Sequence, residues 1–274
     1  MAITMADISK LRTMTGAGMM DCKNALTESN GDFDKAMEII RKKGQAIAAK
    51  RSDRQAAEGC ILADCNGKYA ATLALKCETD FVAKNADFIA LTQKILDSAF
   101  ENKPADLAAL KASNIEGSTI EQLITDRSGI TGEKMEVDMY SFVCGESAIA
   151  YVHPGNKLAA IVAFNQANVD AQVAKDIAMQ VAAMSPIAID ETGVPADVIE
   201  KEKEIAKDKA REAGKPENLL DRIAEGAMKK YYKEYTLLEQ EFIKDSKMTV
   251  SQYMNNASKG LTVTAFKRIT LNQE

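Results

Sequence analysis

Cysteine and histidine are the side chains with which this sequence could perform nucleophilic or metal-dependent chemistry. Cys22 and Cys77 are the candidate nucleophiles, but no basic group is evidently placed to lower the pKa of either thiol. The only histidine, His153, precedes Pro154 in a predicted exposed turn, and it cannot form a histidine metal cluster. Glycine-rich phosphate-binding loops are absent. We therefore expect a protein that is not an enzyme and uses no metal or cofactor; a thiol-dependent enzyme is the alternative.

The charge and composition of the chain restrict its partners and its location. The net charge is −5 and the isoelectric point about 5.3, the wrong sign for a protein that must neutralise nucleic-acid phosphates. No apolar run is long enough to span a membrane, and the first residues do not resemble a secretory signal. Five cysteines without a Cys-x-x-Cys pair predict free, buried thiols in a reducing compartment. We therefore expect a cytoplasmic protein with no direct contact to nucleic acid or membranes.

Methionine and phenylalanine residues beside predicted turns are the side chains with which the chain could grip another protein. Met19 and Met20 follow a glycine-rich turn, and adjacent helical residues point about 100° apart. At least one of them is therefore expected to be exposed, where methionine suits an adaptable contact. Phe81, Phe88 and Ile95 lie seven residues apart, so the spacing alone favours a buried stripe. An exposed Phe81 is the alternative.

Two further expectations concern the surroundings of these residues. Asp80 can cap the helix that carries Phe88, which gives this aspartate a structural explanation. The methionines at Met135, Met139 and Met228 are expected to pack in the core or against a sheet.

The elements that position Met19 and Met20 belong to a small N-terminal module. Residues 1–54 are predicted to form three short helices, the first of which begins at a capping box of Thr4 and Asp7. The basic run from Arg41 to Arg54 is predicted to be a helix end with Gly44 as its C-cap, followed by a solvated linker. A module of this size has a marginal core and is typical of a recognition head tethered to a larger body.

The rest of the chain contains an internal duplication. Asn66-Gly67-Lys68 leads into an apolar run at 69–75, and Gly155-Asn156-Lys157 leads into a similar run at 158–164. Farther on, Thr119–Ile124 resembles Thr249–Met254, and a strand-like segment follows each. We therefore predict two copies of a unit in which a β-hairpin leads into helices and ends in a closing strand.

The second copy carries an insertion. Residues 197–212 are densely charged, Gly214 and Pro216 interrupt the helical pattern, and a second helix follows through Tyr235. This pattern predicts an antiparallel helical hairpin that projects as an arm. The fold class is α+β, because the strands come as hairpins and not as parallel crossovers. The predicted domains are a three-helix docking domain with its linker at 1–54, the first core copy at 55–144, the first part of the second copy at 145–195, the arm at 196–235 and the completion of the second copy at 236–274.

Four segments resemble the signatures of the bacterial translation elongation factor Ts family. Thr15–Leu26 resembles the N-terminal signature of that family, and Cys77–Asn85 resembles its second signature. Gly214–Glu217 begins a third motif, and Leu237–Gln240 before Phe242 resembles a fourth. The four occur in the order of the family, so the resemblance extends over nearly the whole chain.

The resemblance implies a UBA-like N-terminal domain and a guanine-nucleotide exchange factor for the GTPase elongation factor Tu. In the family, an Asp-Phe pair enters the partner near its magnesium and phosphate site, and GDP is released. It further implies a set of partner-binding residues in a loop of the first copy, in the head, in a second loop and in a helix of the second copy. These are Thr79, Asp80, Phe81, Val82, Met19, Met20, Gly132 and Gln180, the last at a position where the family often has histidine.

By the resemblance, Phe81 is an exposed wedge and Asp80 fixes the start of its helix, the reverse of what the spacing alone favours. A homodimer, or a two-plus-two complex with elongation factor Tu, is left open. An alternative from another class is an adaptor or chaperone cofactor whose three-helix head docks on a helix of some other client.

Overall fold

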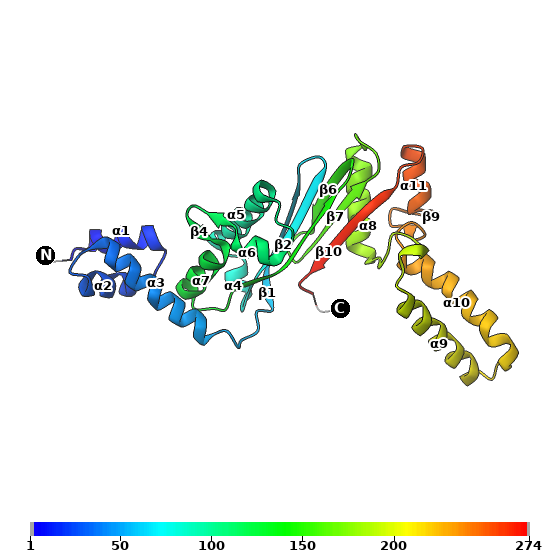
Figure 1. Cartoon of the computed structure of the whole chain (residues 1–274), viewed down its shortest axis with the longest axis horizontal. Helices are drawn as coiled ribbons and strands as arrows, with labels where there is room; N and C mark the ends of the chain where they lie inside the picture. Colours follow the sequence, from blue (N-terminus) through cyan, green and yellow to red (C-terminus); the bar gives the residue numbers. More distant parts are fainter. Residues whose placement is uncertain (1–2, 273–274) are drawn as a thin grey trace. The chain divides into compact units, whose positions relative to one another are not determined.

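The computed structural model describes residues 3–272, which divide into two compact units (Figure 1). One unit runs to Leu62 and resumes over Leu73–Tyr140. The other holds Ala63–Thr72 and Ser141–Thr270. Each unit combines separate stretches of the chain, so the two units do not coincide with the two sequence copies. The predicted domain boundaries therefore remain a prediction.

The N-terminal helices form where the capping signals predict them. Helix α1 (Met5–Thr15) begins at Thr4, whose hydroxyl accepts from Asp7 N while the Asp7 carboxylate accepts from Thr4 N. Helices α2 (Met19–Glu28) and α3 (Phe33–Lys50) complete a small core built around Leu11, Cys22 and Leu26. These three helices are called the head below.

The prediction that Gly44 ends the third helix is wrong. Helix α3 continues through Gly44 to Lys50, and Gly44 is buried. Its lack of a side chain admits another helix backbone, that of Gly129, so the glycine serves a close packing contact and not a helix end.

The first copy is a three-stranded antiparallel unit with helices. Its sheet order is β1-β2-β5, so the closing strand lies beside the second strand of the hairpin. Its elements are β1 (Glu58–Cys65), β2 (Tyr69–Cys77), α4 (Asp80–Ala83), α5 (Ala86–Asn102), α6 (Leu107–Ala112), β3 (Asn114–Ile115), β4 (Ser118–Thr119), α7 (Ile120–Thr131) and β5 (Glu136–Cys144).

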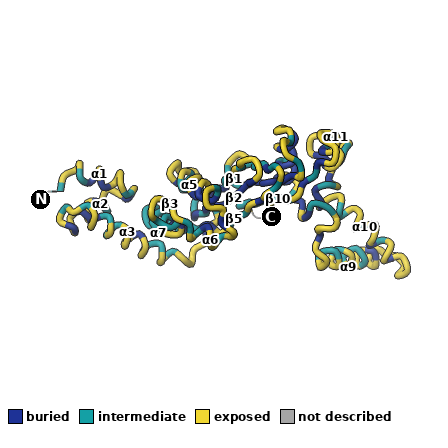
Figure 2. Tube along the Cα trace, turned by 45° about the horizontal axis from the view of Figure 1, so that its top comes forward, coloured by how far each residue is buried: buried dark blue, intermediate teal, exposed yellow. Residues whose placement is uncertain are grey.

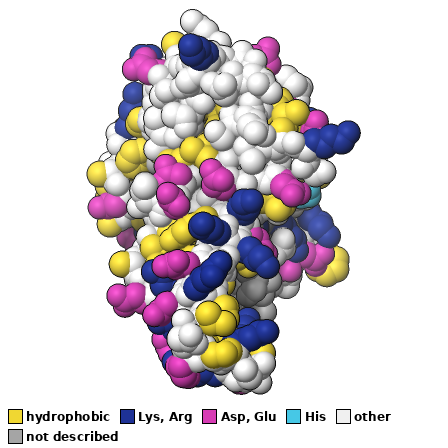
Figure 3. All heavy atoms as spheres, turned by 90° about the vertical axis from the view of Figure 1, so that its right-hand side faces the viewer, with side chains coloured by type: hydrophobic (Ala, Val, Ile, Leu, Met, Phe, Trp, Pro, Cys, Tyr) yellow, Lys and Arg dark blue, Asp and Glu magenta, His cyan; other side chains and the backbone are white. Residues whose placement is uncertain are grey.

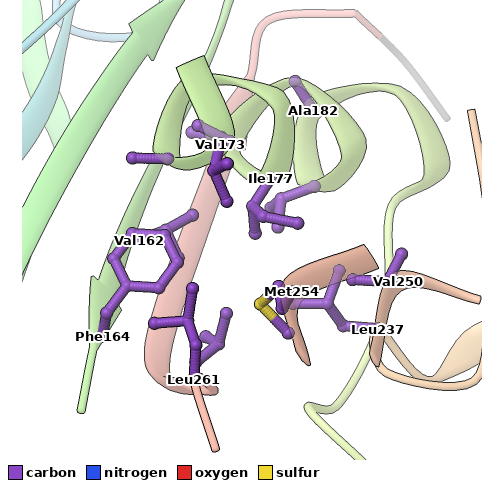
Figure 4. Packing of buried hydrophobic residues seen from close by; sticks show 14 residues of the cluster. Val162, Phe164, Val173, Ile177, Ala182, Leu237, Val250, Met254 and Leu261 are labelled. Atoms are coloured by element: carbon purple, nitrogen blue, oxygen red, sulfur yellow. The ribbon is translucent and has the colours of Figure 1, made fainter. Parts of the chain in front are cut away.

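The second copy repeats this plan with the sheet order β10-β7-β6. Strand β7 pairs with β6 through Ile149↔Val162 and with β10 through Phe266↔Val162. Figure 4 shows side chains of α8, β7 and α11 meeting in one apolar interior around Ile177 and Met254. The elements are β6 (Ser147–Val152), β7 (Leu158–Phe164), α8 (Ala171–Met184), a 3₁₀ turn η1 (Glu191–Gly193), β8 (Glu241–Phe242), β9 (Asp245–Thr249), α11 (Val250–Ala257) and β10 (Val263–Thr270).

The duplication extends to the chemistry of the helix starts. The hydroxyls of Thr119 and Thr249 each accept from the backbone N–H of the glutamine three residues on. The side chain of that glutamine accepts from the backbone N–H of the threonine, so α7 and α11 each begin with a capping box. Each helix is followed by the strand that closes its sheet. The α+β fold with a duplicated core is therefore confirmed.

The inserted arm consists of α9 (Ala196–Glu212), a short turn η2 (Glu217–Leu219) and α10 (Leu220–Tyr235), which run antiparallel (Figure 1). Only a thin seam is buried, chiefly Ala210, Ala224 and Met228, and Figure 2 shows much of both helices exposed. Lysine, arginine and acidic side chains are interspersed over the face in Figure 3. The predicted hairpin and the buried position of Met228 are confirmed. Met135 is also buried, and Met139 is half-buried in β5.

Candidate functional site

Phe81 is the most exposed large apolar side chain in the described part of the chain, with 84% of its surface open to solvent. The spacing favoured a buried stripe with Phe88 and Ile95, and this expectation is wrong for Phe81. Phe88 and Ile95 are fully buried on α5, whereas Phe81 lies on α4, a separate single turn of helix. The break between the two helices removes Phe81 from the stripe and leaves it exposed.

Two different caps create that break. The Thr79 hydroxyl accepts from Val82 N and starts α4, and the Asn85 amide oxygen accepts from Asp87 N and starts α5. The prediction that Asp80 caps the helix of Phe88 is therefore wrong. The Asp80 carboxylate instead pairs with Lys84 at 2.7 Å, and this hydrogen bond raises the pKa of Lys84. Residues 78–85 are called the Phe81 turn below.

Two glutamates clamp the entrance of the Phe81 turn reciprocally. Glu133, two residues after α7, accepts from Glu78 N and Thr79 N, both at 3.1 Å, and from the Thr79 hydroxyl at 2.6 Å. Glu78 in return accepts from Lys134 N at 2.7 Å. Hydrogen bonds from backbone N–H groups to carboxylates are among the stronger ones in proteins. The loop after α7 and the start of the Phe81 turn are therefore fixed to each other.

Two arginines of the basic run also bind this clamp. Arg51 and Arg54 reach the Glu78 carboxylate at 3.3 and 3.0 Å. The pKa of Glu78 is lowered, first by the hydrogen bond from Lys134 N and then by the two guanidinium groups. The prediction of a merely solvated linker is therefore wrong for these two side chains.

Helix α7 also grips the far end of the Phe81 turn. The Arg127 guanidinium lies 3.4 Å from the Asn85 amide oxygen and 3.2 Å from the Asp87 carboxylate. Because Glu133 holds Thr79 and Arg127 holds Asn85, α7 and its following loop bracket Phe81 on both sides. Sequence reasoning missed Glu78, Arg127 and Glu133, since all three act across more than 40 residues of sequence.

Gly132 lies next to this clamp and has a backbone role of its own. It caps the C-terminus of α7 in the left-handed conformation, with φ 72°, and its N–H donates to Ser128 O. The structure thus brings Gly132 together with Thr79, Asp80, Phe81 and the half-buried Val82. A contact between Gly132 and a partner remains a prediction.

Met19 and Met20 begin α2 in the head and are both exposed, by 41% and 65%. The expectation that at least one of them is exposed is confirmed. The turn that precedes them lies against α7, since a methyl group on Gly16 would lie 3.7 Å from Ile130 Cδ1. Helix α7 is therefore common to the surroundings of these methionines and of Phe81.

Gln180 is not available at the surface, which corrects its assignment to a partner-binding set. It is fully buried in α8, and its amide donates to Gln240 Oε1 and Glu241 O and accepts from Ile243 N. A buried carboxamide with donors and acceptor satisfied in this way holds the β8–β9 hairpin to α8.

The thiols and the histidine differ in burial. Burial raises the pKa of Cys77 to about 12, with a further contribution from Glu133, so its thiolate is strongly disfavoured. Cys144 is exposed, contrary to the expectation that the free thiols are buried. His153 is exposed, as predicted, and its Nδ1 lies 3.0 Å from the Tyr151 hydroxyl.

Within residues 3–272, no group of three or more histidine, cysteine or acidic side chains is arranged to hold a metal ion. Over the same range, no helix combines the length and the apolar character needed to cross a bilayer.

Comparisons with known proteins place these residues in a family context. The model of a family described as Elongation factor TS matches residues 78–273, which include the Phe81 turn and the arm. Elongation factor Ts of Porphyromonas gingivalis is 62% identical over the full length of both chains. The proteins of the same name from Azobacteroides pseudotrichonymphae and Bacteroides thetaiotaomicron are 54% and 49% identical, again with both chains covered throughout.

Proposed function

The chain belongs to the elongation factor Ts family of translation elongation factors, and from this premise we propose that it is a guanine-nucleotide exchange factor for elongation factor Tu. It acts in the cytoplasm by binding that GTPase and releasing its GDP. No covalent step, metal or cofactor of its own is required. Whether it works as a homodimer or in a two-plus-two complex stays a prediction.

The exposure of Phe81 is the observation that carries the proposal. Leaving a phenylalanine side chain in water forgoes about 1.5–3 kcal/mol relative to burying it. Side chains of α7 and its loop nevertheless bind residues on both sides of Phe81: Glu133 binds Thr79, and Arg127 binds the side chain of Asn85. An exposed aromatic side chain on a turn that is fixed in this way is typical of an interface anchor, which is buried in a pocket of the partner.

The task of an exchange factor is kinetic. A nucleotide bound with a Kd of roughly 1 nM is held by about 12 kcal/mol. With an association rate constant of ~10⁶ M⁻¹s⁻¹ it would leave at only ~10⁻³ s⁻¹. Much of that hold comes from magnesium and from oriented backbone N–H groups around the phosphates. A side chain that displaces these groups accelerates release without bond chemistry.

The predicted site residues then have distinct roles. Phe81 is the wedge, and Thr79 and the half-buried Val82 fix the single helical turn that carries it. The Asp80 carboxylate pairs with Lys84 within the same turn, beside Phe81. Met19 and Met20 supply a second, adaptable contact from the head. Gln180 has an internal role only.

The test is release of fluorescent GDP from elongation factor Tu with the variant Phe81→Ala. We expect release to slow by about 10- to 100-fold at equal concentrations, as for truncation of an interface anchor worth about 1.4–2.8 kcal/mol. The matched control is Leu219→Ala, which truncates an exposed apolar side chain on the arm and should leave the rate unchanged. Wild-type release by a folded Phe81→Ala variant would reject the wedge.

A further inference from the structure

Two glycines allow α3 and α7 to touch backbone to backbone. Gly44 is the twelfth residue of α3 and is buried, and Gly129 lies near the end of α7. A methyl group on Gly129 would lie 2.6 Å from the carbonyl carbon and 2.8 Å from the carbonyl oxygen of Gly44, and it would overlap the Cα atom. No side chain fits at Gly129 unless one of the two helices moves.

The contact is asymmetric, which provides an internal control. A methyl group on Gly44 would lie 3.4 Å from Gly129 Cα and 3.9 Å from Asp126 O, which are ordinary packing distances. The same chemical change is therefore tolerated from the α3 side and excluded from the α7 side. A third helical glycine, Gly226 in α10, faces open space, so a methyl group there meets nothing.

The remainder of this contact is loosely filled. A cavity of about 340 Å³ lies beside the crossing and is lined by both helices and the turn before α2. Arg41 of α3 and Asp126 of α7 form a charged pair beside it, separated by 3.6 Å and half exposed on the arginine side. Side-chain packing therefore does not fix the spacing of α3 and α7 on the side of the cavity. The spacing depends on the contact between the backbones at Gly44 and Gly129.

Helix α7 thus supports the two exposed groups of the proposed site at once. Toward the head it carries Gly129 and Ile130, which lie against Gly44 and the turn that precedes Met19. Toward the first copy it carries Arg127 and leads into Glu133, which hold the Phe81 turn. These contacts all fall within the seven residues from 127 to 133.

We propose that Gly129 is a positioning residue that sets the spacing between the head methionines and Phe81, so that both engage one partner molecule simultaneously. The inference rests on the proposed exchange function. Two contacts on one rigid support act at a high effective concentration, which is lost when their spacing no longer matches the partner. Gly129 touches no partner itself and acts through α3.

The functional test measures fluorescent-GDP release from elongation factor Tu against the concentration of the chain. Gly129→Ala should raise the half-saturating concentration on the order of tenfold. This is a part of the gain in affinity of about 10²–10⁴ that linking two contacts can supply. The maximal rate should change by less than about twofold, because the Phe81 turn keeps its own clamp. Gly44→Ala and Gly226→Ala gain the same helix propensity and should behave as the wild type.

A double variant separates positioning from general weakening. Met20→Ala should raise the half-saturating concentration in the wild-type, Gly44→Ala and Gly226→Ala backgrounds alike, but add little in Gly129→Ala, where the head is already displaced. Full additivity in the Gly129→Ala background, or a Gly129→Ala variant that behaves as Gly44→Ala, overturns the proposal.

Hydrogen exchange without the partner tests the crossing independently of any exchange activity. Gly129→Ala should accelerate exchange in residues 41–50 of α3 while β2 and β7 stay protected; unchanged protection of α3 overturns the proposal. Should Gly129→Ala fail to fold, Gly44→Val enlarges the same crossing from the head side with α7 unaltered, and both readouts apply to it. If the wild-type chain does not accelerate GDP release from elongation factor Tu, the exchange function itself is refuted. If the wild type is active and Gly129→Ala behaves like it, only the positioning role of Gly129 is refuted.

Discussion

At the scale of single residues, an apolar side chain is held outward by charged ones. Phe81 leaves 84% of its surface in solvent, so its place depends chiefly on the backbone of its turn. The Glu133 carboxylate accepts from the backbone N–H groups of Glu78 and Thr79, and the Glu78 carboxylate in return accepts from Lys134 N in the loop after α7. Carboxylates accept from several N–H groups at once, which suits them to fix a short turn that lacks a core of its own.

Glu133 should therefore be the most sensitive part of the clamp. Glu133→Gln removes the charge of the acceptor and places an NH₂ group either opposite the N–H groups of Glu78 and Thr79 or opposite the Thr79 hydroxyl, which now donates to Glu133. We expect a loss of about 1–3 kcal/mol in the free energy of unfolding, the cost of leaving such donors unpaired. Urea denaturation measures it. The control Glu146→Gln, at an exposed glutamate paired with Lys68, should cost less than about 1 kcal/mol; equal losses in the two variants would contradict the clamp.

The clamp should also respond to acid, through Glu78. The pKa of Glu78 is lowered in the folded chain by Lys134 N, Arg54 and Arg51. A lowered pKa means that the carboxylate stabilises the fold above its unfolded pKa of about 4.3 and loses this contribution as pH falls through the folded value. The difference in unfolding free energy between wild type and Glu78→Gln should therefore be constant above that pH and shrink below it. Urea titrations between pH 3 and 7 measure it, and a difference independent of pH would exclude this role for Glu78.

At the scale of elements, the second copy carries the same clamp built from different groups. The loop after β7 binds the loop after α11: Asn165 donates to Gly260 O and accepts from Thr262 N, both at 2.9 Å. Gln166 donates to Lys259 O at 3.0 Å and accepts from Ser258 Oγ at 2.7 Å. Carboxamides do not titrate, so only the clamp of the first copy depends on pH. In both copies the loop after the second strand of the hairpin is therefore bound to the loop after the last helix.

The elements were predictable where the signal was local. The capping boxes at Thr4, Thr119 and Thr249 fixed helix starts, and the two glycine turns at 67 and 155 fixed the hairpins. The seven-residue spacing from Phe81 to Phe88 misled, because it assumes one continuous helix where Thr79 and Asn85 start two. The signal for two helices was present, since both caps are of the residue types that begin helices.

The partners of the site were not predictable, because they depend on pairings across long stretches of chain. Nothing in the string Gly132-Glu133-Lys134 states that its carboxylate binds Thr79. Gly44 has the residue type of a C-cap, and only the approach of Gly129 shows that it serves packing instead. Gln180 likewise has the residue type of a surface contact, and burial beside Gln240 decides otherwise.

At the scale of the whole molecule, exchange requires a difference between two bound states of the partner. A contact that is equally strong in the GDP-bound and the empty partner adds affinity but accelerates nothing. By reciprocity, the factor by which the chain weakens GDP binding equals the factor by which GDP weakens binding of the chain. The head and the Phe81 turn can therefore be assigned separate shares of this energy.

We expect Phe81 to carry the difference and Met20 to carry affinity common to both states. The dissociation constant of the chain should be larger with GDP-bound than with nucleotide-free elongation factor Tu, by a factor of about 5–150 if the coupling is of the usual 1–3 kcal/mol. Phe81→Ala should bring that ratio toward one. Met20→Ala should weaken both complexes by the same factor and leave the ratio unchanged, because an adaptable methionine on the head does not compete with magnesium or phosphate. Isothermal titration calorimetry of the wild type and the two variants with both forms of the partner measures the six dissociation constants. If the ratio of the two dissociation constants falls with Met20→Ala and persists with Phe81→Ala, the side chain that weakens GDP binding lies in the head and not in the Phe81 turn.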